Sequence, residues 1–430
     1  MRSFNPFFLT HPFIQMTIIN GIEIDNIDYK VNDIKFAIKN NDPIEDKLNV
    51  IAVISNPCLF AKRYILLKEF VKRIEEEEDH VNLFVVEMVY KDQKFIVTDK
   101  HNKNHLQLRT DVPIWHKENM VNLGVKYLLP ADWKAFAWID ADVEFDNNSW
   151  ALDTLKVLNG AKDVVQLFSH CVDMDKQGNN LNVFNSFGYC FNKNKPYTIK
   201  SSDYWHPGYA WAITRRAYAK IGGLYEKGLL GSGDNIMALA FINKCKNMNN
   251  PNYSDDYNNS MLEYQINASK LRLGYVPGII RHHYHGSKAN RRYTERWQIL
   301  MQHNFSPVTH LKYDSKGILI PSETFSEELK EDVFNYFFGK ERGRVRELRS
   351  LMIPPLRGTT LSAEGATLAL WASQPPWTPP LKGTKVQGTF GITAEGSYTW
   401  SNLWLLSAEK WSTEGALPLD PSFNFLMMIL

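Results

Sequence analysis

The sequence predicts an α/β protein with a mostly parallel, Rossmann-like central sheet flanked by helices. Short apolar runs alternate with segments of helical spacing along most of the chain, which is the pattern of strands joined by crossover helices. With 430 residues the chain is also long enough to bury a sizeable core. We expect one domain at residues 49–343, an N-terminal extension at 1–48 and an atypical tail at 344–430.

The first elements of this sheet are expected directly after the extension. The run NVIAVISN begins at Asn49, ends at Pro57 and has the composition of a strand buried on both faces. Residues 64–74 carry apolar side chains on one helical face and Lys or Glu on the other. Residues 81–90, VNLFVVEMVY, are again apolar, so strand, helix and strand follow in order.

The same alternation continues to about residue 278. An apolar helical stripe between Met120 and Leu128 precedes a short strand, AFAWID. Further helices are expected at Trp150–Leu158 and 234–244, and further strands at 163–168, Tyr209–Thr214 and 271–278.

Bulk composition excludes several classes of protein. The formal net charge is only +2 and 22% of residues are charged, so no nucleic-acid partner is expected. Four widely spaced cysteines without a CxxC pair exclude a zinc knuckle and a dense disulfide framework. The apolar residues 1–15 are too few and too interrupted to span a bilayer, and they lack signal-peptide features. We therefore expect a soluble, cytoplasmic protein without a transmembrane segment.

The tail from 344 to 430 differs in composition from the rest of the chain. It is rich in Trp, Pro, Gly, Thr and Ser and contains few of the Asn residues that are frequent in the rest of the chain. It shows neither the apolar periodicity of a helix nor that of a strand. We interpret it as poorly ordered or not native to the main unit. The alternative is a small β module whose Trp side chains stack on sugar rings.

The strongest functional signal is the run WIDADVEF. It places two carboxylates, Asp140 and Asp142, at the C-terminal end of an apolar strand, which is where open α/β sheets bind ligands. An isolated Asp-x-Asp often only caps a turn. In an apolar context, however, the pair incurs a desolvation cost unless a cation compensates it, and oxygen ligands of this kind favour Mg²⁺ or Mn²⁺.

A second signal is the basic, histidine-rich segment RHHYHGSKANRRY. A histidine can complete a metal shell that carboxylates leave open, and Mn²⁺ tolerates imidazole better than Mg²⁺ does. Lys288 and Arg291 could neutralise a diphosphate. The alternative is a solvated basic loop whose histidines only form hydrogen bonds.

The third signal is a glycine-rich block that ends in GSGDN. Its glycines, Gly233 among them, let the backbone approach a ligand closely, and Asp234 follows directly. A carboxylate at this point could accept the proton of an attacking hydroxyl. Asp234 could also be the N-cap of the following helix, a position that favours the same residue type.

Four blocks, over about residues 49–320, resemble the GT-A-fold glycosyltransferases, in particular their inverting galactosyltransferase-like branch. The blocks are VISNPCLFAKR, the segment from Trp115 to Phe145 that contains WIDADVEF, the GG…GSGDN block and RHHYHGSKANRRY. This branch usually has two adjacent acids in its glycine block, whereas this chain has Asp234 and Asn235. The departure puts one acceptor contact in doubt. The Asn-, Lys- and Ile-rich body is similar to proteins of AT-rich genomes such as those of large DNA viruses.

The resemblance implies a role for each matching residue. Asp234 would be the catalytic base. The metal would be bound by Asp142 and His285, with His283 as the alternative ligand. The nucleotide sugar would contact Pro57, Arg63 and Asp140, with Lys288 and Arg291 near the diphosphate, and the acceptor would contact Tyr209, Trp211 and Gly233.

The function predicted from these features is metal-dependent transfer of a sugar from a nucleotide-diphosphate donor to a hydroxyl acceptor. A UDP-sugar donor, a glycan or glycoprotein acceptor, inversion at the anomeric carbon and Mn²⁺ or Mg²⁺ as cofactor are expected. Two alternatives stay open. A sugar nucleotidyltransferase would need a glycine-rich loop after its first strand, which SNPCLFAKR does not provide, and a non-catalytic glycan-binding protein would not consume the donor.

Overall fold

The computed structural model describes one compact part of the chain. This part lies within the unit Met1–Met352. The described residues are 47–159, 162–198, 204–286 and 293–338, and the strand pair β1 (Thr17–Ile19) and β2 (Ile22–Ile24). The remaining N-terminal extension and the tail at 344–430 lie outside the described residues, so the predictions for them stay predictions.

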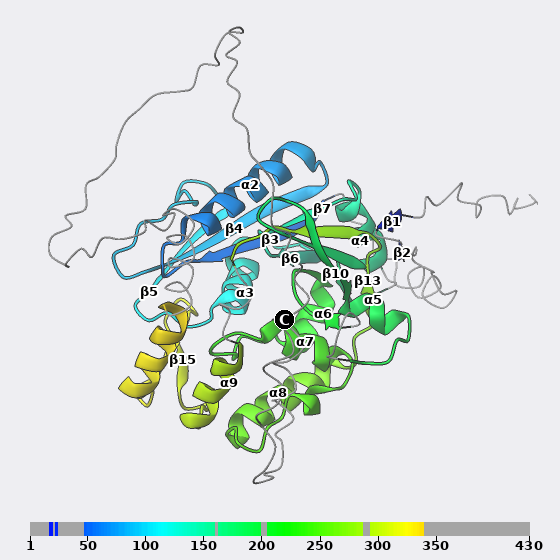
Figure 1. The fold of residues 1–430 in the computed structure, drawn as a ribbon. Helices are drawn as coiled ribbons and strands as arrows, with labels where there is room; N and C mark the ends of the chain where they lie inside the picture. Colours follow the sequence, from blue (N-terminus) through cyan, green and yellow to red (C-terminus); the bar gives the residue numbers. More distant parts are fainter. Residues whose placement is uncertain are drawn as a thin grey trace, which may run out of the picture. The chain divides into compact units, whose positions relative to one another are not determined.

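A mixed seven-stranded sheet forms the centre of the fold (Figure 1). Among its described strands, β12 runs antiparallel to both neighbours and the others run parallel to one another. In spatial order the strands are β13 (Leu273–Tyr275), β8 (Val164–Gln166), β12 (Ala210–Thr214), β6 (Ala135–Ile139), β3 (Leu48–Ser55), β4 (Val81–Tyr90) and β5 (His105–Thr110). The predicted α/β fold with a mostly parallel sheet is confirmed.

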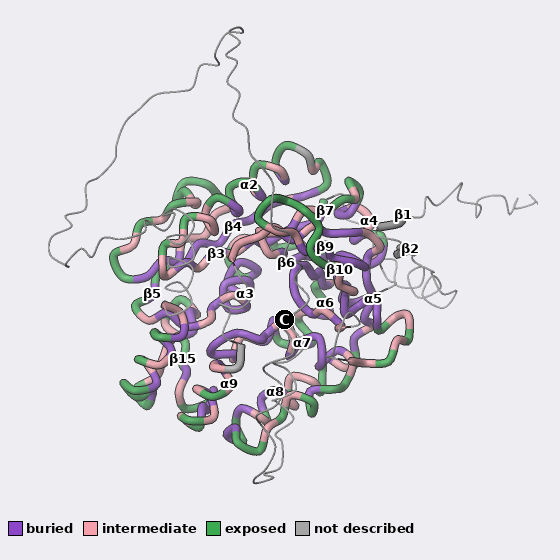
Figure 2. Tube along the Cα trace, in the orientation of Figure 1, coloured by how far each residue is buried: buried purple, intermediate pink, exposed green. Residues whose placement is uncertain are grey.

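Helices cover both faces of this sheet, which explains why its central strands are apolar throughout. Helices α2 (Ala61–Glu77) and α4 (Trp150–Leu158) pack on one face, where Phe70 and Leu155 join the same hydrophobic cluster. Helix α3 (Lys117–Tyr127) packs on the other face. Figure 2 shows the strands between these layers as buried and the outer side of α2 as largely exposed.

A second, five-stranded sheet lies beside the first and was not expected from the sequence. Its strand β14 pairs in parallel with β9 and antiparallel with β7, so that His282 lies opposite both Asp173 and Val143. This pairing brings the residues after the Asp-x-Asp motif next to the histidine-rich segment. The strands, in spatial order, are β11 (Trp205–His206), β10 (Asn180–Ser186), β9 (His170–Met174), β14 (Ile279–His282) and β7 (Val143–Phe145).

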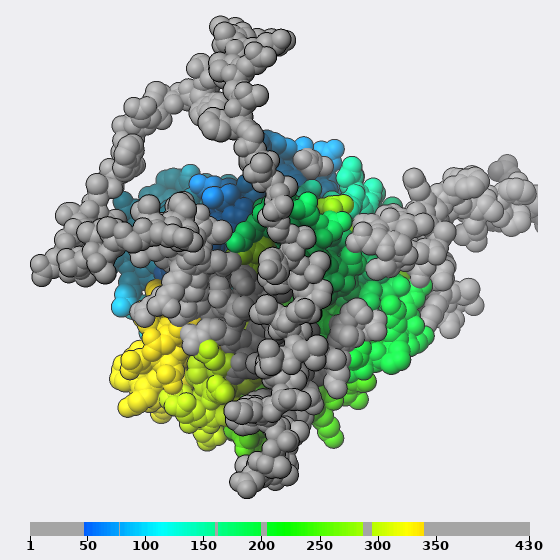
Figure 3. All heavy atoms as spheres, viewed as in Figure 1, coloured from blue at the N-terminus to red at the C-terminus, as the bar shows by residue number. Residues whose placement is uncertain are grey.

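The C-terminal half of the described chain is mainly helical. In Figure 3 the residues after about 300 (yellow) and the segment of α2 (blue) are both visible on the face shown. No helix in the described ranges is long and apolar enough to cross a membrane. Residues 327–338 are also helical. The other elements are α5 (Phe187–Asn192), α6 (Arg215–Ile221), α7 (Gly233–Phe241), η2 (Cys245–Asn247), α8 (Asp255–Ala268), α9 (Tyr293–Gln302), β15 (Leu311–Tyr313) and β16 (Leu319–Pro321).

A buried ion pair fastens β8 to the rest of the seven-stranded sheet. Asp163, directly before β8, accepts hydrogen bonds from the backbone N–H of Arg272 at 2.9 Å and from its guanidinium Nε and Nη2, both at 3.0 Å. The carbonyl of Asp163 also accepts from the N–H of Thr214. Burial alone would raise the pKa of Asp163, but these hydrogen bonds and the charge of Arg272 outweigh it and lower the pKa.

Replacing Asp163 by asparagine is therefore expected to destabilise the fold by about 2 kcal/mol at pH 7, because it removes a buried carboxylate that accepts three hydrogen bonds from Arg272 and leaves this partly buried guanidinium without its charge partner. The carboxylate with a lowered pKa stabilises the fold above its unfolded pKa, and this contribution is lost as pH falls through the folded value. Urea denaturation of both proteins should show the difference shrinking below about pH 4. Glu323→Gln, at a carboxylate that is 81% exposed, is the control, and an equal effect of the two substitutions would contradict the assignment.

Candidate functional site

The Asp-x-Asp motif lies in the tight connection between β6 and β7, at the C-terminal edge of the seven-stranded sheet. The N–H of Asp140 donates to the carbonyl of Tyr209 at 2.8 Å, and the N–H of His283 donates to the carbonyl of Asp142 at 2.8 Å. The two carboxylates are thereby anchored both to the adjoining strand and to the segment after β14. This edge is where open α/β sheets bind ligands.

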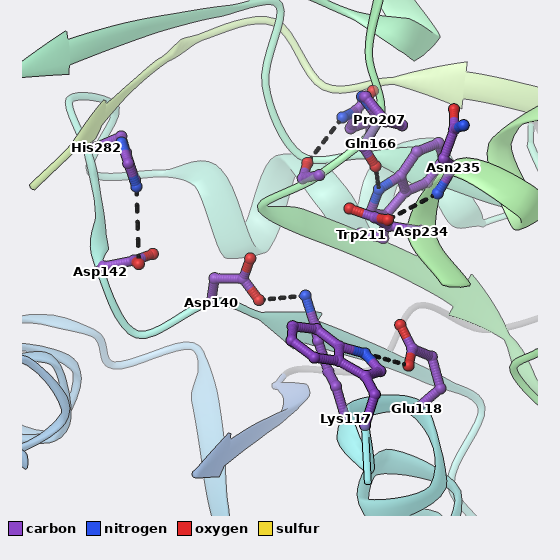
Figure 4. A network of polar contacts seen from close by, with 12 residues as sticks. Lys117, Glu118, Asp140, Asp142, Gln166, Pro207, Trp211, Asp234, Asn235 and His282 are labelled. Carbon is purple, nitrogen blue, oxygen red and sulfur yellow. Dashed lines mark hydrogen bonds and ion pairs between the residues drawn. The ribbon is translucent and has the colours of Figure 1, made fainter. Parts of the chain in front are cut away.

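Asp142 and two histidines form one compact group. Oδ2 of Asp142 lies 3.2 Å from Nε2 of His285 and 3.7 Å from Nε2 of His282. The three potential ligand atoms all lie within 4.8 Å of one another. Figure 4 shows the side chain of His282 pointing toward Asp142. Residues far apart in the sequence thus converge on one point.

The chemistry of this group fits a divalent cation such as Mn²⁺. One carboxylate oxygen and two imidazole nitrogens are ligands that such an ion accepts, and three protein ligands leave positions for water and for phosphate oxygens. Nδ1 of His282 lies 2.6 Å from Oδ1 of Asp173, a buried carboxylate on β9. A ligating histidine commonly donates its other ring N–H to a carboxylate in this way, and this directs Nε2 toward the ion.

The proton on His282 offsets part of the negative charge of the two carboxylates beside it. Burial alone lowers the pKa of His282, but the carboxylates of Asp142 and Asp173 raise it to about 9. At neutral pH an imidazolium therefore lies between two carboxylates. A cation that binds here has to displace this proton, because the metal ligand is the neutral imidazole.

The histidine that pairs with His285 differs from the one expected. His283, the alternative ligand in the sequence prediction, points to Glu144, with 3.1 Å between Nε2 and Oε2. His282 takes the place beside Asp142 instead. His282 is the last residue of β14 and His283 follows it directly. Successive side chains in extended backbone point to opposite sides, so only one of these two neighbours can face the motif. Two adjacent histidines in the sequence do not indicate which of them does.

Replacing Asp173 by asparagine is expected to weaken Mn²⁺ binding by about 10- to 100-fold, because the amide accepts a weaker hydrogen bond and no longer fixes the ring of His282. Calorimetric titration with MnCl₂ measures this. Asp153→Asn, a partly exposed carboxylate on α4, serves as the control. An unchanged dissociation constant for Asp173→Asn would show that His282 is not a ligand.

Lys117 and Glu118, at the start of α3, complete the site and were not predicted as functional. The ammonium group of Lys117 forms an ion pair with Asp140 (Figure 4). Burial alone would lower the pKa of Lys117, but the carboxylates of Asp140, Asp234 and Glu118 outweigh it and raise the pKa. Lys117 is thus a partly buried cation among three acids. The adjacent Lys-Glu pair in WHKEN was the available signal, although charge pairs of this kind are common on helix surfaces.

Asp234 faces the same site from the first turn of α7. The helix begins at Gly233 with Ser232 as its N-cap, so Asp234 lies within the helix and is not the cap. Ser232 has a φ of 76°, a conformation that non-glycine residues rarely adopt and that clusters at functional sites. The guanidinium of Arg296 donates to the hydroxyl of Ser232. A Cβ at Gly208 would lie only 3.2 Å from Oδ2 of Asp234, so the backbone approaches this carboxylate closely.

The two aromatic residues expected at the acceptor site occupy different environments. Tyr209 has a φ of 81°, and its ring stacks on His206 with centroids 4.3 Å apart and packs on His282 at 4.8 Å. Trp211 is 2% exposed, donates from Nε1 to the carbonyl of Pro207 at 2.8 Å and belongs to the hydrophobic core. Tyr209 therefore adjoins the histidine cluster, whereas Trp211 lies in the core and holds the backbone at Pro207 by its hydrogen bond.

The predicted nucleotide-binding residues lie partly in the described chain. Pro57 follows β3 and its carbonyl accepts from the side chain of Gln93 at 2.8 Å. Arg63, in the first turn of α2, donates to the carbonyl of Ser55 at 3.3 Å. Pro57 lies in the connection after β3 and Arg63 at the start of the helix that follows, at the edge that also carries Asp140. Lys288 and Arg291 lie outside the described residues.

Comparison with known proteins gives only distant similarity. No protein-family model matches the chain, and no curated protein matches it. The catalytic domain of Drosophila β1,4-galactosyltransferase 7, solved with xylobiose, is similar at 10% identity and a TM-score of 0.32, over 65% of this chain and 93% of its own. A putative nucleotide-diphospho-sugar transferase from Desulfovibrio desulfuricans is similar at 9% identity and a TM-score of 0.27, over 68% and 99%. With TM-scores this low, any function has to be supported by the site itself.

Proposed function

We propose that this chain is a metal-dependent GT-A-type glycosyltransferase that moves a sugar from a nucleotide-diphosphate donor to a hydroxyl acceptor. The observation that carries the proposal is the convergence of Asp142, His282 and His285 at the C-terminal edge of the sheet. Asp140 lies within electrostatic reach of both Asp142 and Asp234, so the metal group and the proposed base share one site. Figure 4 shows Asp140 and Lys117 between the side chains of Asp142 and Asp234.

The donor is expected to bind on the metal side of the site. Asp142, His282 and His285 would hold Mn²⁺ or Mg²⁺, which when bound stabilises the negative charge of the leaving diphosphate. Asp140, which forms an ion pair with Lys117, is proposed to bind the ribose or a metal-linked water. Pro57 and Arg63 are proposed to contact the nucleotide. The position of Pro57 and of the first turn of α2 at the C-terminal edge of the sheet supports this role.

Asp234 is proposed to act as the base for the acceptor. Its carboxylate takes the proton of the acceptor hydroxyl while the acceptor oxygen forms a bond to the anomeric carbon. The bond from that carbon to the diphosphate oxygen breaks, and its electron pair leaves with the nucleotide. A single displacement of this kind inverts the anomeric carbon. Holding both substrates in line can itself contribute several kcal/mol to lowering the barrier.

The substrates are proposed as a UDP-sugar and a glycan or glycoprotein hydroxyl. Because specificity depends on a few pocket contacts and not on the fold, the sugar has to be identified by experiment. Tyr209 and the backbone near Gly233 are proposed to line the acceptor side. Tyr209 supports this role through its packing on His206 and His282.

An activity panel tests the proposal against its alternatives. The full chain is incubated with UDP-, GDP- and TDP-sugars and Mn²⁺, with and without a mixture of oligosaccharide acceptors, and the released nucleotide is measured. A glycosyltransferase releases nucleoside diphosphate in an EDTA-sensitive, acceptor-dependent manner. A sugar nucleotidyltransferase instead converts the donor and added pyrophosphate into nucleoside triphosphate and sugar phosphate, and a glycan-binding protein leaves the donor intact. Either of these results would reject the proposal.

A further inference from the structure

Glu118 is a buried carboxylate that touches the turn carrying the proposed base. It is the second residue of α3 and is 3% exposed. A Cβ at Gly233 would lie 2.5 Å from both Cδ and Oε1 of Glu118, so the carboxyl group packs directly on the backbone of Gly233. The other oxygen, Oε2, accepts from Nε1 of Trp115 at 2.9 Å (Figure 4). Glu118 is therefore held in place from both sides.

The groups that face Glu118 come from three elements. Lys117 is its neighbour on α3, Asp234 faces it from α7 and Tyr264 from α8. Burial raises the pKa of Glu118 to about 7, Lys117 opposes the shift and Asp234 adds to it. An ionised Glu118 therefore adds a second negative charge close to the carboxylate of Asp234.

Asn235 follows Asp234, but its side chain is directed toward Met248. Its amide Nδ2 contacts the sulfur of Met248 at 3.1 Å. Glu118 instead brings a second carboxylate to Asp234 from a separate helix.

We propose that Glu118 is the second acid of the acceptor side, a positioning residue that holds the Gly233–Asp234 turn and places negative charge beside the base. This inference rests on the proposed function. The requirement for glycine at 233 follows from it, since any side chain there would displace the Glu118 carboxyl group. The contact of the carboxyl group with Gly233 and its bond to Trp115 keep the charge beside the turn instead of in solvent.

The test compares the full-length wild type with Glu118→Gln and with Trp115→Phe, offering UDP-galactose, UDP-glucose and GDP-mannose with Mn²⁺ and the acceptor mixture. The wild-type kcat should rise between about pH 6 and 8 as Glu118 ionises. Glu118→Gln should lack this rise and be slower at pH 8 by about tenfold or more. Trp115→Phe removes a hydrogen bond to the ionised form and should shift the rise to higher pH.

Melting temperatures supply a readout that does not require turnover. Because the folded-state pKa is raised, ionising Glu118 costs stability as pH increases from its unfolded value to about 7. Glu118→Gln should therefore melt at a higher temperature than wild type at pH 8 and not at pH 5. Glu263→Gln, an exposed glutamate on α8, should change neither quantity.

Each result has a defined meaning. If the wild type releases nucleotide but Glu118→Gln keeps the same pH profile and kcat, the inference is wrong and the proposed function stands. If Glu118→Gln melts lower at both pH values and loses activity uniformly, Glu118 is only structural and the inference is also wrong. If the wild type releases no nucleotide from any of the three donors, the proposed function and the inference both fail.

Discussion

Asp234→Asn should lower the rate of sugar transfer by about 10²- to 10⁴-fold, because the amide cannot accept the proton of the attacking hydroxyl. Metal-dependent binding of the nucleotide should persist, since Asp142 and the two histidines are unchanged. The measurement combines the initial rate of acceptor glycosylation with calorimetric titration of UDP in the presence of Mn²⁺.

The matched control separates proton transfer from helix stabilisation. Asp255 lies in the first turn of α8 as Asp234 lies in the first turn of α7, and it is exposed. Each aspartate stabilises its helix by about 0.3–1 kcal/mol through the helix dipole. Asp255→Asn should therefore cost similar stability without reducing transfer. A fully active Asp234→Asn protein would exclude Asp234 as the base.

The parts of the fold that the sequence predicted are those buried on both faces. The strands β3, β4 and β6 were expected because a strand covered by helices on both sides is a continuous apolar run. The five-stranded sheet was missed for the opposite reason. Strand β10 reads NLNVFNS with an exposed first half, and β7 has only three residues, so neither shows a usable period.

The site shows the same division between local pattern and tertiary packing. The position of Asp142 at the end of an apolar strand was readable because it depends only on local sequence. The choice of His282 over His283 depends on how β14 pairs with β7 and β9. Glu118 was missed because its significance comes from contact with Gly233, a residue more than 100 positions away.

The geometry also explains why three acids can coexist beside one another at this edge. Asp140 and Asp142 are separated by a single residue, and Asp234 lies within electrostatic reach of Asp140. Burial raises the pKa of Asp140, and Lys117 opposes this by forming an ion pair with it. The second compensating charge is the proton on His282, which a cation would replace. A divalent cation in place of this proton would add one further positive charge to the group.

Mn²⁺ binding is expected to have a large effect on the stability of the fold. Saturating Mn²⁺ should stabilise the wild-type chain, by about 2.7 kcal/mol at a concentration of 100 times the dissociation constant. Asp142→Ala, His282→Gln and His285→Gln should each abolish most of this gain, because each removes one of three protein ligands. Thermal melts with and without MnCl₂ measure the gain directly and require no substrate.

His283→Gln is the control that decides between the two histidine assignments. Its ring bonds to Glu144 and lies outside the cluster, so this variant should keep the full stabilisation by Mn²⁺. His282 and His283 are adjacent in the sequence, and their rings point to opposite sides of the chain, toward Asp142 and Glu144 respectively. Loss of the Mn²⁺ effect in His283→Gln together with its retention in His282→Gln would mean that the strand presents its opposite face to Asp142, and the assigned metal group would then be wrong.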